Sequence, residues 1–83
     1  MQVTLKLFAT LSDYLPPGAA KNAVPREVGD GVSVRDLLAS TGVPMEKCHL
    51  ILVNGVYVAP ARAGEKQLAA GDTVSVWPPV AGG

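Results

Sequence analysis

The sequence predicts an α+β domain of two layers, in which helices cover one face of a β-sheet. Three observations lead to this prediction. The opening segment alternates apolar and polar side chains, as a strand does when one face is buried and the other is in water. A capped helical segment lies near the middle of the chain, and an Asn-Gly turn joins two apolar runs after it.

Length, charge and cysteine content limit the kinds of function. A chain of 83 residues fits one domain with a small core and no deep enclosed active site. Seven basic and seven acidic side chains balance without a run of either sign, which argues against nucleic-acid and membrane partners. No apolar stretch approaches the roughly 20 residues that span a bilayer. The single cysteine, Cys48, cannot form an internal disulfide, which favours a cytoplasmic protein.

The first third of the chain is expected to hold a strand, a short helix and an edge strand. Residues 2–7 alternate with a period of two, and apolar side chains in 11–15 have the i, i+3, i+4 spacing of one helix face. Pro-Pro-Gly at 16–18 would end that helix. Residues 24–28 favour a second strand, which Pro25 would confine to the edge of the sheet or to a strand start.

The main helix is predicted to begin after Ser33, whose hydroxyl can cap it, and Asp36 suits its first turn. Gly42 is expected to end the helix, and Pro44 follows as a helix breaker. Three residues form its apolar face: Val34, Leu37 and Leu38.

A β-hairpin should follow the helix. The apolar run at 49–53 reads as an inner strand, and Asn54-Gly55 is the strongest short signal for a hairpin turn. Residues 56–58 would form the return strand, which Pro60 ends.

The remaining loop and strand lead to the C-terminal segment. Residues 61–70 read as a loop with one helical turn near Gln67 and Leu68. The Gly-Asp pair at 71–72 is expected to turn the chain into a last strand at 73–77. Within that strand the two valines should face the core, because side chains alternate between the faces.

The last six residues differ from the rest of the chain. The prolines at 78–79 cannot donate to a ladder, so they end the strand pairing and favour stiff, extended backbone. Residues 80–83 have small side chains or none, and we expect them to be mobile. The sequence therefore predicts a rigid body at 1–77 and a tail at 78–83 that can extend about 20 Å. This tail would present the carboxylate of Gly83 to a partner.

Glycine at such a tip has a physical use. Without a Cβ atom it can pass through a narrow channel and adopt angles closed to other residues. A partner enzyme could then adenylate the Gly83 carboxylate with ATP and make it an electrophile for a sulfur nucleophile. The plainer interpretation of the Gly-Gly pair is a frayed end without chemistry, and the dipeptide alone does not decide between the two.

Three segments resemble one known family. They are LFATL at 7–11, LVNG at 52–55 and AGDTVSVWPPVAGG at 70–83. Together they resemble the β-grasp, ubiquitin-like sulfur carriers of the MoaD and ThiS group, above all MoaD, the small subunit of molybdopterin synthase. The resemblance covers the whole chain, is specific in the final segment and is loose between 16 and 48. It implies a mixed sheet in which the first and last strands lie side by side, with helices on one face.

The resemblance also implies a function. In that family a ubiquitin-activating-type, MoeB-like enzyme adenylates the last glycine, which becomes a thiocarboxylate. Its sulfur then enters a cyclic pterin at the MoaE-like large subunit of molybdopterin synthase, in molybdenum or tungsten cofactor biosynthesis. Gly83 would be the carrier residue and Gly82 its slim neighbour. Four residues would thread the partner's channel: Pro78, Pro79, Val80 and Ala81.

The same resemblance implies how the chemistry is shared. The chain alone would not be a catalyst and would bind no cofactor, since the partner uses the ATP. A cysteine desulfurase or a rhodanese would supply the sulfur. Alternatives within the class are a ThiS-like carrier for the thiamine thiazole or for another sulfur metabolite. Outside the class, the chain could modify proteins by joining Gly83 to their lysines, or be an interaction domain without tail chemistry.

Three other residues have two interpretations each. Trp77 should point away from the core, where it would anchor a partner or cover a neighbouring strand or the domain's own surface. Cys48 would be a persulfide carrier or, more commonly for such a residue, a small buried hydrophobe. His49 has no second histidine or cysteine partner for a metal site, which argues against a metal or catalytic role.

Overall fold

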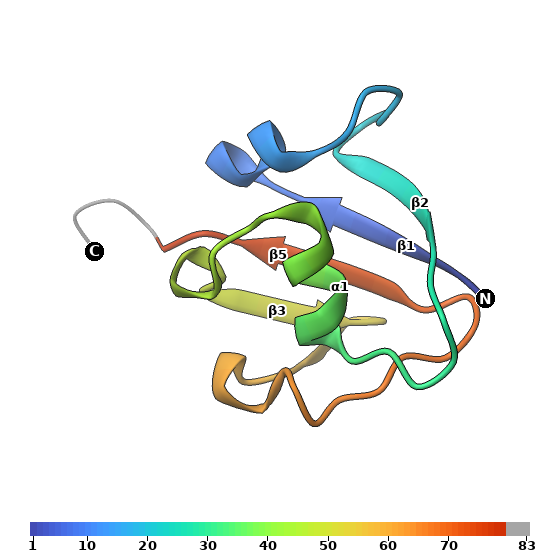
Figure 1. The fold of residues 1–83 in the computed structure, drawn as a ribbon. Coiled ribbons are helices and arrows are strands. Elements are labelled where there is room, and N and C mark those ends of the chain that lie inside the picture. Colours follow the sequence, from blue (N-terminus) through green and yellow to red (C-terminus); the bar gives the residue numbers. More distant parts are fainter. Residues whose placement is uncertain (80–83) are drawn as a thin grey trace.

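A computed structural model describes residues 1–79, which form a five-stranded mixed sheet in the order β2-β1-β5-β3-β4 (Figure 1). Strands β1 and β5 run parallel, and the other neighbouring strands run antiparallel. The last strand in the sequence is therefore the middle strand of the sheet. The strands are β1 (Gln2–Leu7), β2 (Ala23–Glu27), β3 (Leu50–Val53), β4 (Val56–Tyr57) and β5 (Thr73–Trp77).

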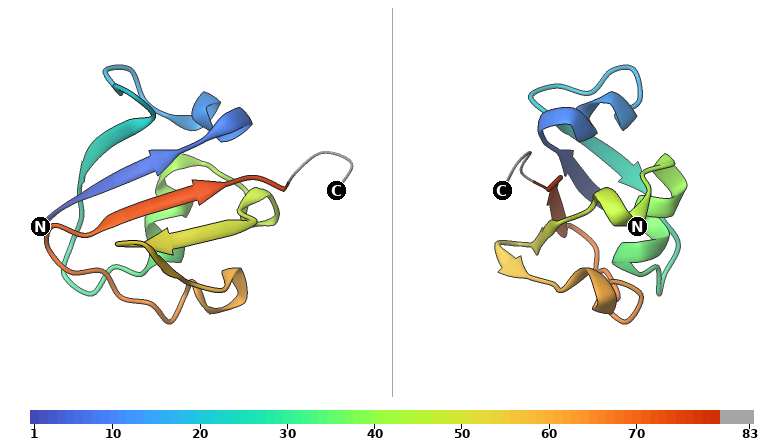
Figure 2. Two further views of the ribbon diagram at one scale, coloured as in Figure 1. Left: turned by 180° about the vertical axis from the view of Figure 1, so that it is seen from behind. Right: turned by 90° about the vertical axis from the view of Figure 1, so that its left-hand side faces the viewer.

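One α-helix and three short 3₁₀ helices accompany the sheet within the described residues. Figure 2 shows α1 against one face of the sheet, while the opposite face is left without a helix. This is the two-layer arrangement that the one-sided alternation predicts. The helices are η1 (Ala9–Tyr14), α1 (Val34–Thr41), η2 (Met45–Lys47) and η3 (Pro60–Arg62).

Helix α1 begins and ends at the predicted residues. Ser33 and Asp36 form a reciprocal capping box, in which the Ser33 hydroxyl accepts from the Asp36 amide at 3.1 Å and the Asp36 carboxylate accepts from the Ser33 amide at 3.3 Å. Gly42 closes the helix in the left-handed region with φ 85°. The predicted apolar face is buried.

The core lies between α1 and the sheet. Alternate residues of β1, β3 and β5 point into it, and on β5 these are Val74 and Val76, as predicted. The eleven largest fully buried side chains are the main source of stability, because apolar burial contributes about 25 cal/mol per Å². They are Val3, Leu5, Leu7, Leu11, Val34, Leu37, Leu38, Cys48, Ile51, Val74 and Val76.

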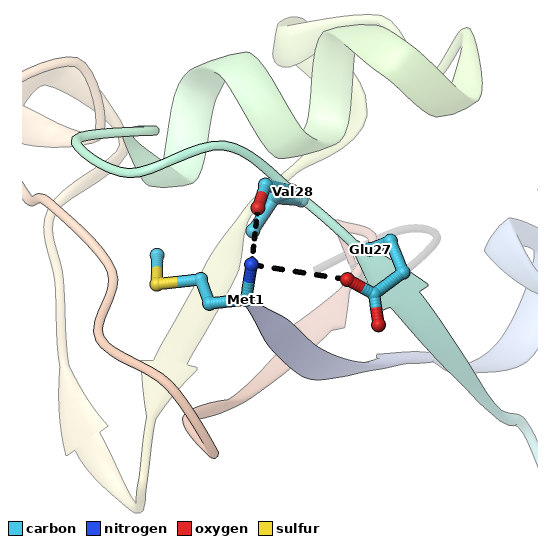
Figure 3. Close-up of polar contacts among 3 residues, drawn as sticks. All are labelled: Met1, Glu27 and Val28. Carbon is cyan, nitrogen blue, oxygen red and sulfur yellow. Dashed lines mark hydrogen bonds and ion pairs between the residues drawn. The ribbon is translucent and has the colours of Figure 1, made fainter.

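Strand β2 is an edge strand, as Pro25 requires. Pro25 lies opposite Thr4 of β1 and its missing donor faces the open edge. Figure 3 shows how the start of β1 is joined to the end of this strand. The Met1 amine donates to the Val28 carbonyl at 2.8 Å and lies 3.8 Å from the Glu27 carboxylate.

The short helix predicted before residues 16–18 is present as the 3₁₀ helix η1, in which Leu11 is buried. The helical turn expected near Gln67 and Leu68 is wrong, since the turn is η3, which Pro60 begins. Leu68 instead donates its amide to the Val32 carbonyl at 2.8 Å and packs into the core.

Among residues 1–79, no helix has both the length and the apolar character to span a membrane.

Candidate functional site

The site is the C-terminal end of β5, where the chain leaves the middle of the sheet. Neighbouring segments hold this end from both sides. The Trp77 carbonyl accepts from the His49 amide at 3.0 Å, and the Val76 carbonyl accepts from the Phe8 amide at 3.1 Å. Strand pairing stops at the next residue because Pro78 has no backbone donor. The position at which the tail leaves the domain is therefore fixed by β1 and β3.

Trp77 lies on the open face of the sheet, as predicted from the burial of its neighbours in β5. Its ring stacks on Phe8, with centroids 4.4 Å apart and planes 4° from parallel. Such a pair contributes about 0.5–1.5 kcal/mol beyond the area that it buries. Trp77 thus covers its own domain, which is one of its two predicted roles. It also stays half-buried rather than buried, so part of the ring is available to a partner.

An apolar groove of about 480 Å³ lies beside this stack. Segments far apart in the sequence build its wall, since η1, the start of β3 and the end of β5 all contribute. The groove includes the first two tail residues, so its wall continues into the tail. The lining residues are Ala9, Thr10, His49, Leu50, Trp77, Pro78 and Pro79.

The structure brings together part of the predicted site. Trp77, Pro78 and Pro79 line one groove, and their predicted role in binding a partner stays a prediction. Four predicted residues lie outside the described residues, so their predicted roles stay predictions: Val80, Ala81, Gly82 and Gly83.

Cys48 is a buried hydrophobe here. Its side chain is 2 % exposed, and burial raises the pKa of its thiol, which disfavours the thiolate that sulfur chemistry needs. His49, by contrast, is exposed on the wall of the groove. No cluster of three or more metal-binding side chains occurs in residues 1–79.

The open sheet face also carries apolar residues that the sequence did not single out. Leu50 lies opposite Trp77 in the β3–β5 ladder, and Leu52 lies opposite Tyr57 in the hairpin. Both leucines are only half-buried, whereas Ile51 and Val53 between them are buried. The alternation within the apolar run of β3 was too weak to reveal this, because all four side chains are apolar. The face beside the tail is thus more apolar than a solvated sheet surface.

Asn54 and Asp72 form a cluster that sequence reasoning treated as two separate turns. The Asn54 side chain donates to the Asp72 carboxylate at 2.9 Å and accepts from the Thr73 amide at 2.9 Å. The same carboxylate accepts from the Ala69 amide at 2.8 Å. Asn54 holds φ 51°, which asparagine tolerates better than most residues. This cluster locks the hairpin to the start of β5 and so sets the register of the strand that bears the tail.

We expect Asp72→Asn to lower stability by about 0.5–1.5 kcal/mol near neutral pH, because it removes charge-assisted hydrogen bonds. The Ala69 amide, followed by the Asn54 side chain, lowers the pKa of the Asp72 carboxyl from 3.8. A carboxyl with a depressed folded-state pKa contributes stability above its ordinary pKa and loses it as the pH falls through the folded value. Urea unfolding of both chains across acid pH should show the difference shrinking below pH 3.8.

The control is Asp30→Asn, because Asp30 is exposed and makes no side-chain hydrogen bond within the described residues. A loss for Asp72→Asn that persists unchanged in acid would show that the carboxylate charge is not what stabilises the turn.

Comparison with known proteins gives one family match and several similar structures. The family model described as Mut7-C ubiquitin matches residues 1–82. SAMP1, the small archaeal modifier protein 1 of Haloferax volcanii, is 26% identical over 100% of both chains, with a TM-score of 0.69. A Pyrococcus furiosus protein assigned as molybdopterin converting factor subunit 1 is 28% identical, with a TM-score of 0.68, over 95% of this chain and 98% of that one.

A third structure shows the fold alone, because it is only 20% identical. It contains subunits 1 and 2 of the molybdopterin-converting factor of Helicobacter pylori, and the match covers 100% of both chains with a TM-score of 0.61. A search of curated proteins found no match. The sheet order and these similarities confirm the predicted β-grasp, ubiquitin-like fold.

Proposed function

This chain belongs to the Mut7-C ubiquitin family, and from that premise we propose that it carries sulfur on the carboxylate of Gly83. One observation carries the proposal most. The middle strand of a ubiquitin-like sheet continues into Pro78-Pro79 beside an apolar groove, and Val-Ala-Gly-Gly follows in the sequence. A rigid body, a defined tail position and a slim glycine tip are what a partner needs to bring one carboxylate into its own active site.

The chemistry takes place in three stages on the Gly83 carboxylate. An oxygen of the carboxylate attacks the α-phosphate of ATP, expels pyrophosphate and forms a mixed anhydride. A sulfur nucleophile then attacks the carbonyl carbon, the bond to AMP breaks and a C–S bond remains. With the cysteine persulfide of a desulfurase or rhodanese as the nucleophile, an acyl disulfide forms and AMP leaves. A thiol then attacks the donor's cysteine sulfur and breaks the S–S bond, which releases the thiocarboxylate, a disulfide and a proton. The thiocarboxylate sulfur finally attacks an electrophilic carbon of the acceptor and displaces a leaving group from it, which gives a thioester. Water then cleaves the acyl C–S bond, so the sulfur stays on the acceptor and Gly83 regains its carboxylate.

All catalytic groups would belong to the partners. Within residues 1–79 the site offers an apolar groove, an exposed imidazole and a hydroxyl, which suit docking better than catalysis. Gly83 is the fourth residue after Pro79, which is about 14 Å of extended chain. We propose that a MoeB-like adenylating enzyme supplies the ATP site and that a cysteine desulfurase or rhodanese supplies the sulfur. This chain would itself bind no cofactor, and the pathway would operate in the cytoplasm.

We propose molybdopterin, for the molybdenum or tungsten cofactor, as the end product. The similarity to the P. furiosus protein supports this choice, as does the Pro-Pro-Val-Ala-Gly-Gly tail. A MoaE-like large subunit would then take the tail. The H. pylori structure, a complex of subunits 1 and 2, is the precedent for that kind of partner.

A protein modifier is the second candidate, and the similarity to SAMP1 favours it. Activation of Gly83 would be the same in both cases. The acceptor would differ, because a lysine amine in place of sulfur gives an isopeptide bond.

The mass of the intact protein from its own cells tests the proposal. We expect a species heavier by the exchange of one oxygen for sulfur, with the change localised to Gly83 by sequencing the terminal peptide. Gly83 joined to lysine would identify a modifier instead. A terminus that is unmodified, and that stays inert with ATP and the adenylating enzyme of the host, would overturn both candidates.

A further inference from the structure

We propose that Thr10 and His49 are specificity-determining residues that select the enzyme which adenylates Gly83. This inference rests on the proposed function and adds to it the groove by which that enzyme recognises the chain. The occupant is an apolar side chain of the adenylating enzyme, next to a group that hydrogen-bonds to the rim of the groove. Neither residue belongs to the tail.

The composition of the groove is the first step. Its lining is almost wholly apolar, and apart from the indole N–H of Trp77 its polar side-chain groups are those of Thr10 and His49. Both are exposed, and neither side chain has a hydrogen-bond partner within residues 1–79. The fold therefore does not need these polar groups for its own stability. A few polar groups in an apolar site are what orients a bound group and distinguishes one partner from another.

The position of the groove indicates what covers it. Pro78 and Pro79 form part of its wall, and Gly83 follows only four residues later. A protein that surrounds the Gly83 carboxylate with an ATP site must enclose the intervening residues, within about 14 Å of the wall. An enzyme large enough to do so lies against the groove as well. The surface that docks the enzyme is thus continuous with the segment that enters its active site.

Apolar contact alone would discriminate poorly between partners. Many proteins present an apolar side chain that could fill such a groove, so apolar contact gives affinity without identifying one partner. A partner that covers Thr10 and His49 removes their hydrogen bonds to water. Its binding is weakened unless it offers hydrogen-bonding groups that replace those bonds. The two side chains also come from separate segments, η1 and the residue before β3, so a partner must satisfy both at once.

The test measures ATP–pyrophosphate exchange by the adenylating enzyme of the host at varied concentrations of the full chain. Thr10→Val keeps the shape and removes the hydroxyl, and His49→Ala removes the imidazole. We expect each to raise the KM for the carrier by about threefold to tenfold and to leave kcat within about twofold, because docking is weakened and the tail is intact. Thr10→Ser and His49→Gln, which keep hydrogen-bonding groups, should restore most of the lost affinity.

Gln67→Ala is the matched control. Gln67 is an exposed polar residue that lines a second groove, of about 440 Å³, beside the β3–β4 hairpin. This second groove does not include the residues at which the tail leaves the sheet. If the wild type is active and the KM values of Thr10→Val and His49→Ala equal that of the wild type, this inference is overturned. The proposal that the chain carries sulfur would then still stand. A rise in KM that Ser and Gln fail to restore would also overturn it, since shape rather than hydrogen bonding would then be recognised. A wild type that supports no exchange would overturn the proposed function, and this inference with it.

Discussion

A chain that ends at Ala81 is expected to fold normally and to form no adenylate and no thiocarboxylate. The deletion removes Gly82 and Gly83, which lie beyond the residues that build the sheet and the core. The new terminal carboxylate would lie about 7 Å closer to the domain than that of Gly83 in an extended tail. It would also belong to an alanine, whose Cβ atom makes the tip wider than glycine. A reacting group displaced by even 1 Å can lose a hundredfold in rate, so we expect no detectable exchange of pyrophosphate.

Thermal unfolding and intact mass complete this experiment. The midpoint should equal that of the full chain, which separates lost chemistry from lost folding. Gly83→Ala is the intermediate variant, because it keeps the length and the carboxylate and adds one methyl group at the tip. Sulfur loading of the chain that ends at Ala81 would contradict the assignment of the carrier residue.

Leu5→Ala is expected to have the largest effect on stability. Leu5 is fully buried in β1, between Val24 of β2 and Val74 of β5. Removing a buried leucine side chain costs about 2–5 kcal/mol, through lost transfer energy and a residual cavity. A domain of this size is stable by only about 4–12 kcal/mol in total. We therefore expect the variant to be partly unfolded near body temperature, as urea titration monitored by circular dichroism would show.

Gln2→Ala is the control for this substitution. It lies on the same strand but is exposed, so it should change stability by less than about 0.5 kcal/mol. A loss of under about 1 kcal/mol for Leu5→Ala would mean that the helix–sheet core is not the main source of stability.

Much of the fold follows from short-range patterns. The alternation of β1, the Ser33 and Asp36 capping box and the Asn54-Gly55 turn each involve only neighbouring residues, so the sequence was sufficient to predict them. The edge position of β2 followed from the missing donor of Pro25. Strand order required the family resemblance, since periodicity does not say which strands pair.

The sequence did not predict features that depend on distant contacts. The turn near Gln67 was wrong because Val32 binds the backbone of Leu68, a contact between separate segments of the chain. The Asn54–Asp72 cluster was missed for the same reason, since each residue satisfies a turn motif when considered alone.

For the candidate site, the sequence predicted individual residues but not the groove that they line. Trp77 could be singled out from strand alternation and the two prolines from the family resemblance, and all three line the groove. The groove itself could not be predicted, because Thr10, His49 and Trp77 meet only after three segments have come together in the sheet. The two polar residues at the rim of the groove are therefore neighbours only because of the strand order of the sheet.

The central place of β5 has a consequence for synthesis of the chain. During translation, β1, β2, α1 and the hairpin all leave the ribosome before the strand that must lie between β1 and β3. The pairing of residues 4–7 with 73–76 closes nearly the whole chain, and its entropy cost is met only when both segments are present. A chain that stops before residue 73 therefore lacks the middle strand of the sheet. We therefore expect the sheet to close only after residues 73–77 have left the ribosome, late in the synthesis of the chain.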